Sequence, residues 1–265
     1  MTTDASAEAP PLRVEVDTAT KVAVVTLDRP PVNAINRAMH GAIRETFEGF
    51  AARRDVNAVV LTAAGRVFCG GVDLRDRGQA REERPIDPGR SWRDARSSVL
   101  DCAVPVIGAV NGTALGAGLG LLSQCDFLVA SENARFGLTE INVGLLGGGS
   151  AAMHMLGRYK MRRMYFTGEM VGAEELYRLG AVEAVVPPEQ LLPEALKFAT
   201  LIASKSPIAL RMAKESLNRF EEFLLDYERA YRMEQDYTNR LGTFEDAKEG
   251  TAAFLEKREP QWRWR

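Results

Sequence analysis

Residues 105–149 read PVIGAVNGTALGAGLGLLSQCDFLVASENARFGLTEINVGLLGGG, and this stretch holds ten of the chain's 23 glycines. Glycine inside regular structure costs roughly 0.5–1 kcal/mol relative to alanine, so this density requires a reason. Glycine is needed where the backbone takes a positive φ or lies close to a ligand or another backbone. Two features stand out chemically: Gly116-Ala117-Gly118, where a turn becomes a helix, and Glu140, a carboxylate in an apolar and amide-rich run.

Around this stretch, the chain alternates strand-like and helix-like segments up to about residue 190. Continuous apolar or β-branched runs predict strands at 12–16, 22–27, 58–62, 67–69, 104–110, 127–130 and 182–186. Helical spacing predicts helices at 39–52, 115–124, 151–156, 161–166 and 173–179, and later at 191–204, 208–223, 226–240 and 245–257. The sequence therefore predicts a disordered leader over 1–11, an α/β core over 12–190 and a helical C-terminal subdomain over 191–265.

Residues 75–96 interrupt this alternation with twelve charged side chains among 22 positions. Such a density predicts a solvated surface loop. The alternative is a mobile lid over a functional site, because long unstructured loops in compact domains are often functional. Trp92 is the residue to examine in that case.

The composition excludes several classes of protein. The net charge of −2 gives no basic excess of the kind that nucleic-acid binding requires. No apolar run reaches the 18–20 or so residues that cross a membrane, and the N-terminus lacks the pattern of a signal peptide. Three widely spaced cysteines suit reduced thiols in a cytoplasmic protein and show no metal-binding spacing.

Common cofactor and nucleophile motifs are also missing. The glycines do not fit G-x-G-x-x-G, since Leu121 stands where the third glycine belongs, and there is no P-loop. The two histidines, His40 and His154, lie in helical segments without a cluster around them, which disfavours a catalytic triad or a histidine metal site. Carboxylates and backbone groups must therefore supply the chemistry.

Two segments can supply backbone donors. The first N–H groups of a helix have no intrahelical acceptor and lie at the positive end of the helix dipole, which applies to Ala117. The glycines of CGGVD (69–73) let the Val72 N–H face a cleft. Two such groups converging on one carbonyl oxygen form an oxyanion hole. Each cluster alone is better explained by close packing.

Taken together, the motifs resemble the crotonase superfamily, the enoyl-CoA hydratase/isomerase family. The resemblance runs from about residue 12 to the C-terminus and rests on motifs in the right order: LDRPPVNA (27–34), FCGGVDL (68–74), NGTALGAG (111–118) with CD (125–126), FGLTEINVG (136–144) and EGTAAFLEKREP (249–260).

This resemblance implies a crotonase-like α/β spiral of ββα units, with a C-terminal helical region that assembles a homotrimer or a hexamer. The substrate would be an acyl-CoA thioester, with coenzyme A as part of the substrate and no tightly bound cofactor. Its carbonyl would lie between the Val72 and Ala117 N–H groups. The implied substrate and CoA contacts are Ala34, Gly70, Gly71, Asp73, Leu74, Arg75 and Lys257, with Arg66 as a further phosphate neighbour and Lys257 reaching a neighbouring subunit.

The chain departs from the hydratase pattern at Gly120. By the resemblance, hydratases hold a water between two glutamates; the second corresponds to Glu140 and the first to Gly120. A third acid position, used by dienoyl-CoA isomerases, corresponds to Gly148. A buried lone carboxylate has a raised pKa, which suits a proton shuttle. A glutamate introduced at position 120 is expected to raise hydration.

One carboxylate favours double-bond isomerisation of an enoyl-CoA over hydration, with Glu140 as the acid/base. A hydroxycinnamoyl-CoA-type hydratase-lyase is an alternative, in which Tyr231 or Tyr237 would act on the phenol. A non-catalytic acyl-CoA-binding protein is the alternative from another class.

Overall fold

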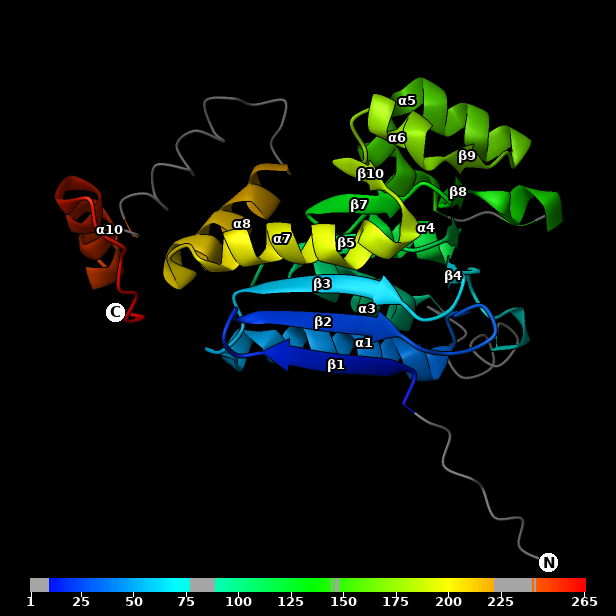
Figure 1. The fold of residues 1–265 in the computed structure, drawn as a ribbon. Coiled ribbons are helices and arrows are strands. Elements are labelled where there is room, and N and C mark those ends of the chain that lie inside the picture. The colour runs from blue at the N-terminus through cyan, green and yellow to red at the C-terminus, as the bar shows by residue number, and fades with distance from the viewer. Residues whose placement is uncertain (1–9, 77–88, 144, 146–147, 222–239, 241) are drawn as a thin grey trace, which may run out of the picture.

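The computed structural model of the 265-residue chain describes residues 10–76, 89–143, 145, 148–221, 240 and 242–265 (Figure 1). The strands in these residues form a six-stranded sheet in the order β1-β2-β3-β5-β7-β10 and a four-stranded sheet in the order β4-β6-β8-β9. Their bounds are β1 Leu12–Asp17, β2 Val22–Leu27, β3 Ala58–Ala63, β4 Val67–Cys69, β5 Val106–Val110, β6 Thr113–Leu115, β7 Phe127–Ser131, β8 Arg135–Gly137, β9 Val171–Gly172 and β10 Ala184–Val186.

Helices follow the strands along the chain. The α-helices in the described residues are α1 Arg37–Gly49, α3 Arg90–Leu100, α4 Ala117–Leu122, α5 Gly149–Thr167, α6 Ala173–Arg178, α7 Leu191–Ala203, α8 Pro207–Glu221 and α10 Glu245–Glu256. Short 3-10 turns are η1 Phe50–Ala52, η2 Leu74–Asp76, η3 Thr139–Val143 and η4 Pro188–Gln190. None of the helices in this part of the chain is long and apolar enough to cross a membrane.

The chain winds as the expected spiral of ββα units. The two strands predicted at 12–16 and 22–27 form an antiparallel hairpin, β1 and β2, and β2, β3, β5, β7 and β10 then pair in parallel. In each later turn one strand enters the large sheet and the next enters the small one, as β3 and β4, β5 and β6, and β7 and β8 do. A helix follows each of these three pairs: α3, α4 and α5. The small sheet therefore consists of the second strand of each of these three turns, together with β9.

Both faces of the large sheet are buried, which explains the continuous apolar runs in its strands. In β3, Val59 and Leu61 pack into the core that contains α1 and α3, whereas Ala58 and Val60 pack against α7. Successive side chains of a strand point to opposite faces, so one strand serves both cores. Figure 1 shows α7 lying across the sheet, with α1 and α3 behind it.

The C-terminal tail packs back against α10 and α8. No further strand follows β10 in the described residues. Asp246 of α10 is 1% exposed and accepts hydrogen bonds from the N–H groups of Arg263 and Trp264, at 2.7 and 3.0 Å. The Arg211 guanidinium of α8 lies 4.9 Å from the Trp264 ring. α7, the first helix after residue 190, packs directly on the large sheet. The predicted subdomain boundary between residues 190 and 191 stays a prediction.

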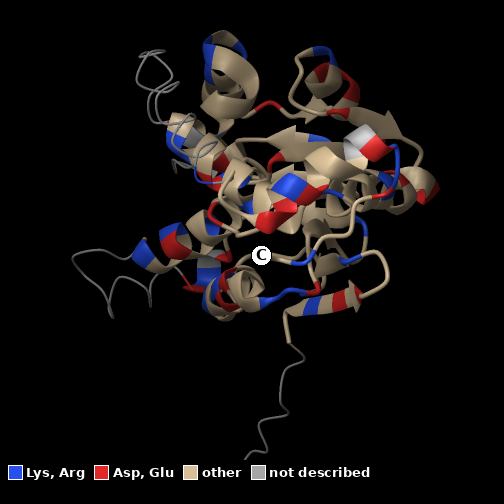
Figure 2. Ribbon diagram, turned by 90° about the vertical axis from the view of Figure 1, so that its left-hand side faces the viewer, with Lys and Arg blue, Asp and Glu red and all other residues tan. Residues whose placement is uncertain are grey.

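Charges are interspersed on the side of the molecule that carries the C-terminus (Figure 2). Many form exposed pairs within one helix, such as Arg178 with Glu175 at 2.7 Å and Lys197 with Glu194 at 2.8 Å. Such pairs contribute about 0–1 kcal/mol each. They therefore contribute little to the stability of the fold.

The structure corrects the sequence-based expectation for residues 75–96. Residues 90–96 are helical, in α3, and not part of a loop or lid. Ala95 and Val99 are buried on one side of this helix, so its many charges lie on the other side and hid the amphipathic pattern. Residues 77–88 lie outside the described residues.

Other differences concern short elements. The strands β6, β8 and β9 are two or three residues long, too short to show a period in the sequence. The two helices predicted at 151–156 and 161–166 are both present within α5, which is broken at Gly157, a non-helical residue with φ +66° and ψ 165°. The helix predicted at 226–240 falls almost entirely outside the described residues.

Candidate active site

In the segment after β4, the Val72 N–H points away from the adjacent segment that contains Ile35. Ile35 bridges Val72 in parallel: the Ile35 N–H donates to the Gly71 carbonyl and the Asp73 N–H to the Ile35 carbonyl, at 2.8 Å each. In a trans peptide the N–H points opposite to the preceding carbonyl. The Val72 N–H therefore points away from Ile35. β6 ends beside this segment, because a Cβ on Gly71 would stand 3.6 Å from the Leu115 carbonyl oxygen.

The second predicted donor, Ala117, is the first residue of α4. Gly116 precedes it with φ +48° and ψ −106°, a conformation that side chains disfavour, and caps the helix without a side-chain hydrogen bond. The first bond of the turn runs from the Gly120 N–H to the Gly116 carbonyl, at 2.8 Å. The Ala117 N–H thus has no acceptor within its helix and lies at the positive end of the dipole.

Close packing brings these two donors into one region. A Cβ on Gly118 would stand 2.7 Å from the Cys69 Cβ and 2.8 Å from the Cys69 carbonyl oxygen, so only glycine lets α4 press against the end of β4. β4 and β6 pair through Cys69 and Ala114, which fixes the register. In the part of the chain that the structure describes, neither the Val72 N–H nor the Ala117 N–H donates to a protein acceptor.

The Glu140 side chain lies against the start of α4. A Cβ on Gly116 would stand 2.8 Å from Glu140 Cδ, so the carboxylate covers the bare α-carbon of Gly116. Its Oε2 atom is buried and has no hydrogen-bond partner among the described residues. Burial raises the pKa of the Glu140 carboxyl above its ordinary value, opposed by a smaller contribution from a backbone hydrogen bond.

Gly120 lies one helical turn further along α4. A Cβ on Gly120 would meet only Trp92, whose Cζ2 atom would be 3.9 Å away. Gly148, at the other position without an acid, caps α5 at φ +72°, and a Cβ there would stand 2.6 Å from the Leu138 side chain. Glu140 is therefore the only acid among these three positions, as the sequence indicates.

Comparison with known proteins identifies the family. A model of the enoyl-CoA hydratase/isomerase family matches residues 17–265. The chain belongs to this family. Its fold is that of the solved enoyl-CoA hydratases: the Mycobacterium smegmatis enoyl-CoA hydratase superposes with a TM-score of 0.88 at 35% identity, over 96% of this chain and 99% of the other.

Two curated relatives differ in their named reactions. One, from Mycobacterium tuberculosis, is named a (7aS)-7a-methyl-1,5-dioxo-2,3,5,6,7,7a-hexahydro-1H-indene-carboxyl-CoA hydrolase; it is 39% identical over 89% of this chain and 95% of its own length. The other is the 2,3-dehydroadipyl-CoA hydratase of Escherichia coli, which is 34% identical over 92% of this chain and 96% of its own length. The chain is an acyl-CoA-processing enzyme of the enoyl-CoA hydratase/isomerase family.

The Asp73 carboxylate holds two arginine side chains of the same chain. It is 6% exposed and binds the guanidinium groups of Arg29, at 3.0 Å, and Arg75, at 2.7 and 2.9 Å. The hydrogen bond from Arg75 is the largest of the effects that hold the pKa of Asp73 well below its usual range. Arg29 also donates to the Ala34 carbonyl, at 2.8 Å, so this cluster ties the 27–34 loop to the 70–75 segment.

The other predicted contacts lie at separate places. Gly70 and Leu74 lie in the same segment as Val72. Gly70 packs on Val32, and Leu74 is the first residue of η2. Arg66 is exposed beyond β3. Lys257 is exposed just after α10, which Figure 1 shows at the opposite end of the molecule from β4. A role for Lys257 within its own subunit's site is not supported, and the predicted reach into a neighbouring subunit stays a prediction.

The histidines and tyrosines complete the predicted set. His154 is exposed on α5, whereas His40 is half-buried on α1 beside Trp92. The described residues contain no cluster of three or more His, Cys, Asp or Glu that could hold a metal. Tyr231 and Tyr237 lie outside the described residues.

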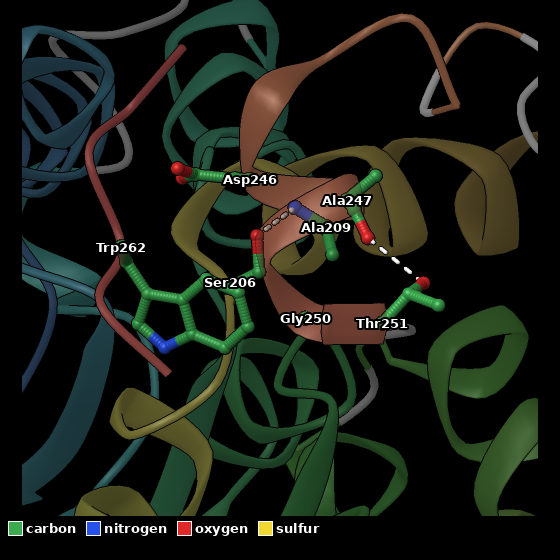
Figure 3. A pocket seen from close by; sticks show the side chains of 7 residues that line it. All are labelled: Ser206, Ala209, Asp246, Ala247, Gly250, Thr251 and Trp262. Carbon is green, nitrogen blue, oxygen red and sulfur yellow. Dashed lines mark hydrogen bonds between the residues drawn. The ribbon is translucent and has the colours of Figure 1, made fainter. Parts of the chain in front are cut away.

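A separate hollow lies between α8, α10 and the C-terminal tail (Figure 3). Its polar groups bond locally: Thr251 donates to the Ala247 carbonyl at 3.1 Å, and the Ala209 N–H donates to Ser206 Oγ at 3.4 Å. Trp262 forms its wall against Gly250. These contacts explain the hollow as a packing feature of the tail.

Sequence reasoning missed the partner of Gly120. Trp92 attracted attention only as part of a charged segment, and nothing in the sequence relates it to α4. Its place follows from the packing of α3 against α1 and α4, which brings residues distant along the chain together.

Proposed function

We propose that this enzyme forms an enolate from an acyl-CoA thioester and uses Glu140 as its single acid/base. The thioester oxygen would accept hydrogen bonds from the Val72 and Ala117 N–H groups. The observation that carries this proposal is the Glu140 carboxylate itself, which lies on Gly116 with a buried, unpaired oxygen. Each donor of such a site contributes about 3 kcal/mol to stabilising the transition state.

Double-bond isomerisation is the reaction that this arrangement favours. A single carboxylate can remove a proton from one carbon of an enoyl chain and return it to another. Syn hydration also requires a positioned water, and the position where a second carboxylate would hold it is Gly120, which faces the Trp92 ring edge. We infer a 3-enoyl-CoA to 2-enoyl-CoA isomerase within the family.

A substrate panel resolved by mass tests this proposal. The purified enzyme is incubated with 3-enoyl-, 2-enoyl-, dienoyl- and hydroxycinnamoyl-CoA, beside Glu140→Gln and the unrelated surface variant Lys197→Ala. Isomerisation leaves the mass unchanged, hydration adds one water, and a hydratase-lyase shortens the acyl group. The proposal predicts isomerisation that Glu140→Gln abolishes and Lys197→Ala retains.

Other outcomes favour the alternatives. Chain shortening of hydroxycinnamoyl-CoA would support the hydratase-lyase. Tight thioester binding without turnover of any substrate would support a non-catalytic acyl-CoA-binding protein. Faster hydration than isomerisation would overturn the preferred reaction but not the role of Glu140.

Hydrolysis of a cyclic dioxo acyl-CoA is a second candidate. The observation that favours it is the 39% identity to the Mycobacterium tuberculosis hydrolase. If water cleaves the thioester, free coenzyme A is released. If water cleaves a ring carbon–carbon bond next to a ketone, the product gains one water in mass and one new carboxylate. An added negative charge therefore distinguishes ring opening from hydration when such a thioester joins the panel.

The remaining proposals concern the state of the enzyme. We propose a homotrimer or hexamer, which light scattering after gel filtration measures directly. We propose that coenzyme A within the substrate is the only cofactor, so activity should survive exhaustive dialysis against a chelator. A cytoplasmic location is proposed from the three unpaired cysteines, Cys69, Cys102 and Cys125.

A further inference from the structure

One face of α4 is bare between two side chains contributed by other elements. Gly116 and Gly120 are four residues apart and joined by the first hydrogen bond of the helix, so they lie on the same face, about 6 Å apart along its axis. Glu140 covers the Gly116 end of this face, and the Trp92 ring edge meets the Gly120 end. The Ala117 N–H belongs to the same turn.

Trp92 is held in place by α1. Its ring packs on His40, with centroids 5.5 Å apart and planes inclined at 37°. His40 Nδ1 lies 3.0 Å from the Ser91 hydroxyl, so the neighbour of Trp92 on α3 is tied to the same histidine. Trp92 is half-buried and packs against the main core. The indole is therefore a fixed wall, supported from behind by two helices.

We propose that Trp92 is a specificity-determining residue of the acyl site, which closes its Gly120 end and favours acyl groups with a flat, apolar segment next to the thioester. This inference rests on the proposed function. An indole edge supplies an apolar surface where a second carboxylate would supply a polar one. It fills the space that a longer side chain at position 120 would enter, and it keeps water from the side of the acyl group that faces it.

The same contact revises the expectation for Gly120→Glu. A Cβ at position 120 is already at van der Waals distance from Trp92 Cζ2, so the rest of a glutamate must compete with the indole. Gly120→Glu alone should not raise hydration. Gly120→Glu combined with Trp92→Ala should raise it, because the alanine vacates the space.

A double-mutant cycle tests this coupling on a short 2-enoyl-CoA and on the matching 3-enoyl-CoA. Wild type, Gly120→Glu, Trp92→Ala and the double variant are compared, with Trp262→Phe as a control in the remote tail. The expected result is a hydration rate in both single variants near that of wild type and a rate at least about tenfold higher in the double variant, which together give a coupling of about 1.4 kcal/mol. Equal hydration by Gly120→Glu alone and the double variant overturns the proposal.

Fluorescence gives a readout that does not depend on turnover. The chain has three tryptophans, so Trp262→Phe with Trp264→Phe leaves Trp92 as the only one. Its emission should change when a 2-enoyl-CoA binds and stay unchanged with free coenzyme A. If calorimetry shows thioester binding and Glu140-dependent turnover while the emission stays constant, the role of Trp92 is wrong and the proposed function stands. If no thioester binds, both are wrong.

Trp92→Phe guards against a folding artefact, because it keeps an apolar ring on His40. It should melt at nearly the wild-type temperature and retain most of the discrimination between unsaturated and branched saturated acyl groups. Loss of discrimination in Trp92→Ala together with its retention in Trp92→Phe supports the proposal. Equal discrimination in all three proteins overturns it.

Discussion

The Glu140 carboxylate rests on the α-carbon of Gly116, where a Cβ would stand only 2.8 Å from Glu140 Cδ. The same glycine has a φ of +48° and immediately precedes Ala117. One residue thus sets the direction of the α4 N-terminus and makes room for the carboxylate. The proposed base and the proposed donor are coupled through Gly116.

Gly116→Ala should therefore lower activity much more than stability explains. Gly180→Ala is the matched control, since Gly180 also has a positive φ, at +75°, but nothing lies within 4 Å of its Cβ position. Gly180→Ala should lose about 1–2 kcal/mol of unfolding free energy from backbone strain. Gly116→Ala should lose at least as much, because its Cβ also meets the Glu140 carboxylate. Only Gly116→Ala should lower kcat/KM. Equal kcat/KM losses in the two folded variants would contradict the coupling.

The pH dependence of kcat/KM should report the raised pKa of Glu140. The base must be ionised to remove a proton, so the rate should rise with pH through an apparent pKa above the usual glutamate value of about 4.3. Rate profiles of wild type measure this limb. A limb at or below the usual value would contradict burial as the control on Glu140.

The raised pKa of Glu140 should also make the free energy of unfolding depend on pH. The folded state holds the Glu140 proton more tightly than the unfolded state does, so its contribution to stability falls as pH rises from the unfolded pKa through the folded one. Glu140→Gln should consequently be at least as stable as wild type at pH 7, and the difference should vanish in acid. Denaturant unfolding at several pH values checks this, and a less stable Glu140→Gln protein at pH 7 would oppose it.

Lys214 should matter for stability and not for chemistry. Its side chain is 3% exposed and its Nζ atom lies 2.6 Å from Asp126 Oδ2, which also accepts from the Val106 N–H. Lys214→Ala leaves that carboxylate unpaired and should cost about 3 kcal/mol of unfolding free energy. Lys197→Ala, which breaks an exposed pair, should cost less than about 1 kcal/mol. Similar losses in both variants would show that Lys214 is not anchoring α8.

Much of the fold follows from the sequence, and the reasons differ between elements. The strand at 58–63 is readable because both its faces are buried, which makes it continuously apolar. α3 was obscured because few of its side chains are buried among many charged ones. β6, β8 and β9 were not predicted from the sequence, and their pairing depends on the spiral that brings successive turns together.

The candidate site divides in the same way. Glu140 and the glycines around Ala117 stand out in the sequence because a carboxylate in an apolar run and glycines at a helix start are each unusual. The contact of Trp92 with Gly120 joins α3 to α4, and no spacing along the chain encodes it. Sequence reasoning therefore suffices to propose the acid and the donors, whereas the proposal for Trp92 requires the structure.

Proton exchange with solvent tests the central claim most directly, because it requires enolate formation and is independent of the overall reaction. A 3-enoyl-CoA is incubated in deuterium oxide with wild type or Glu140→Gln, and deuterium entering the acyl chain is followed by mass. The account predicts rapid incorporation by wild type and a rate at least about 100-fold lower for Glu140→Gln. Equal incorporation by the two proteins would contradict the assignment of Glu140 as the acid/base.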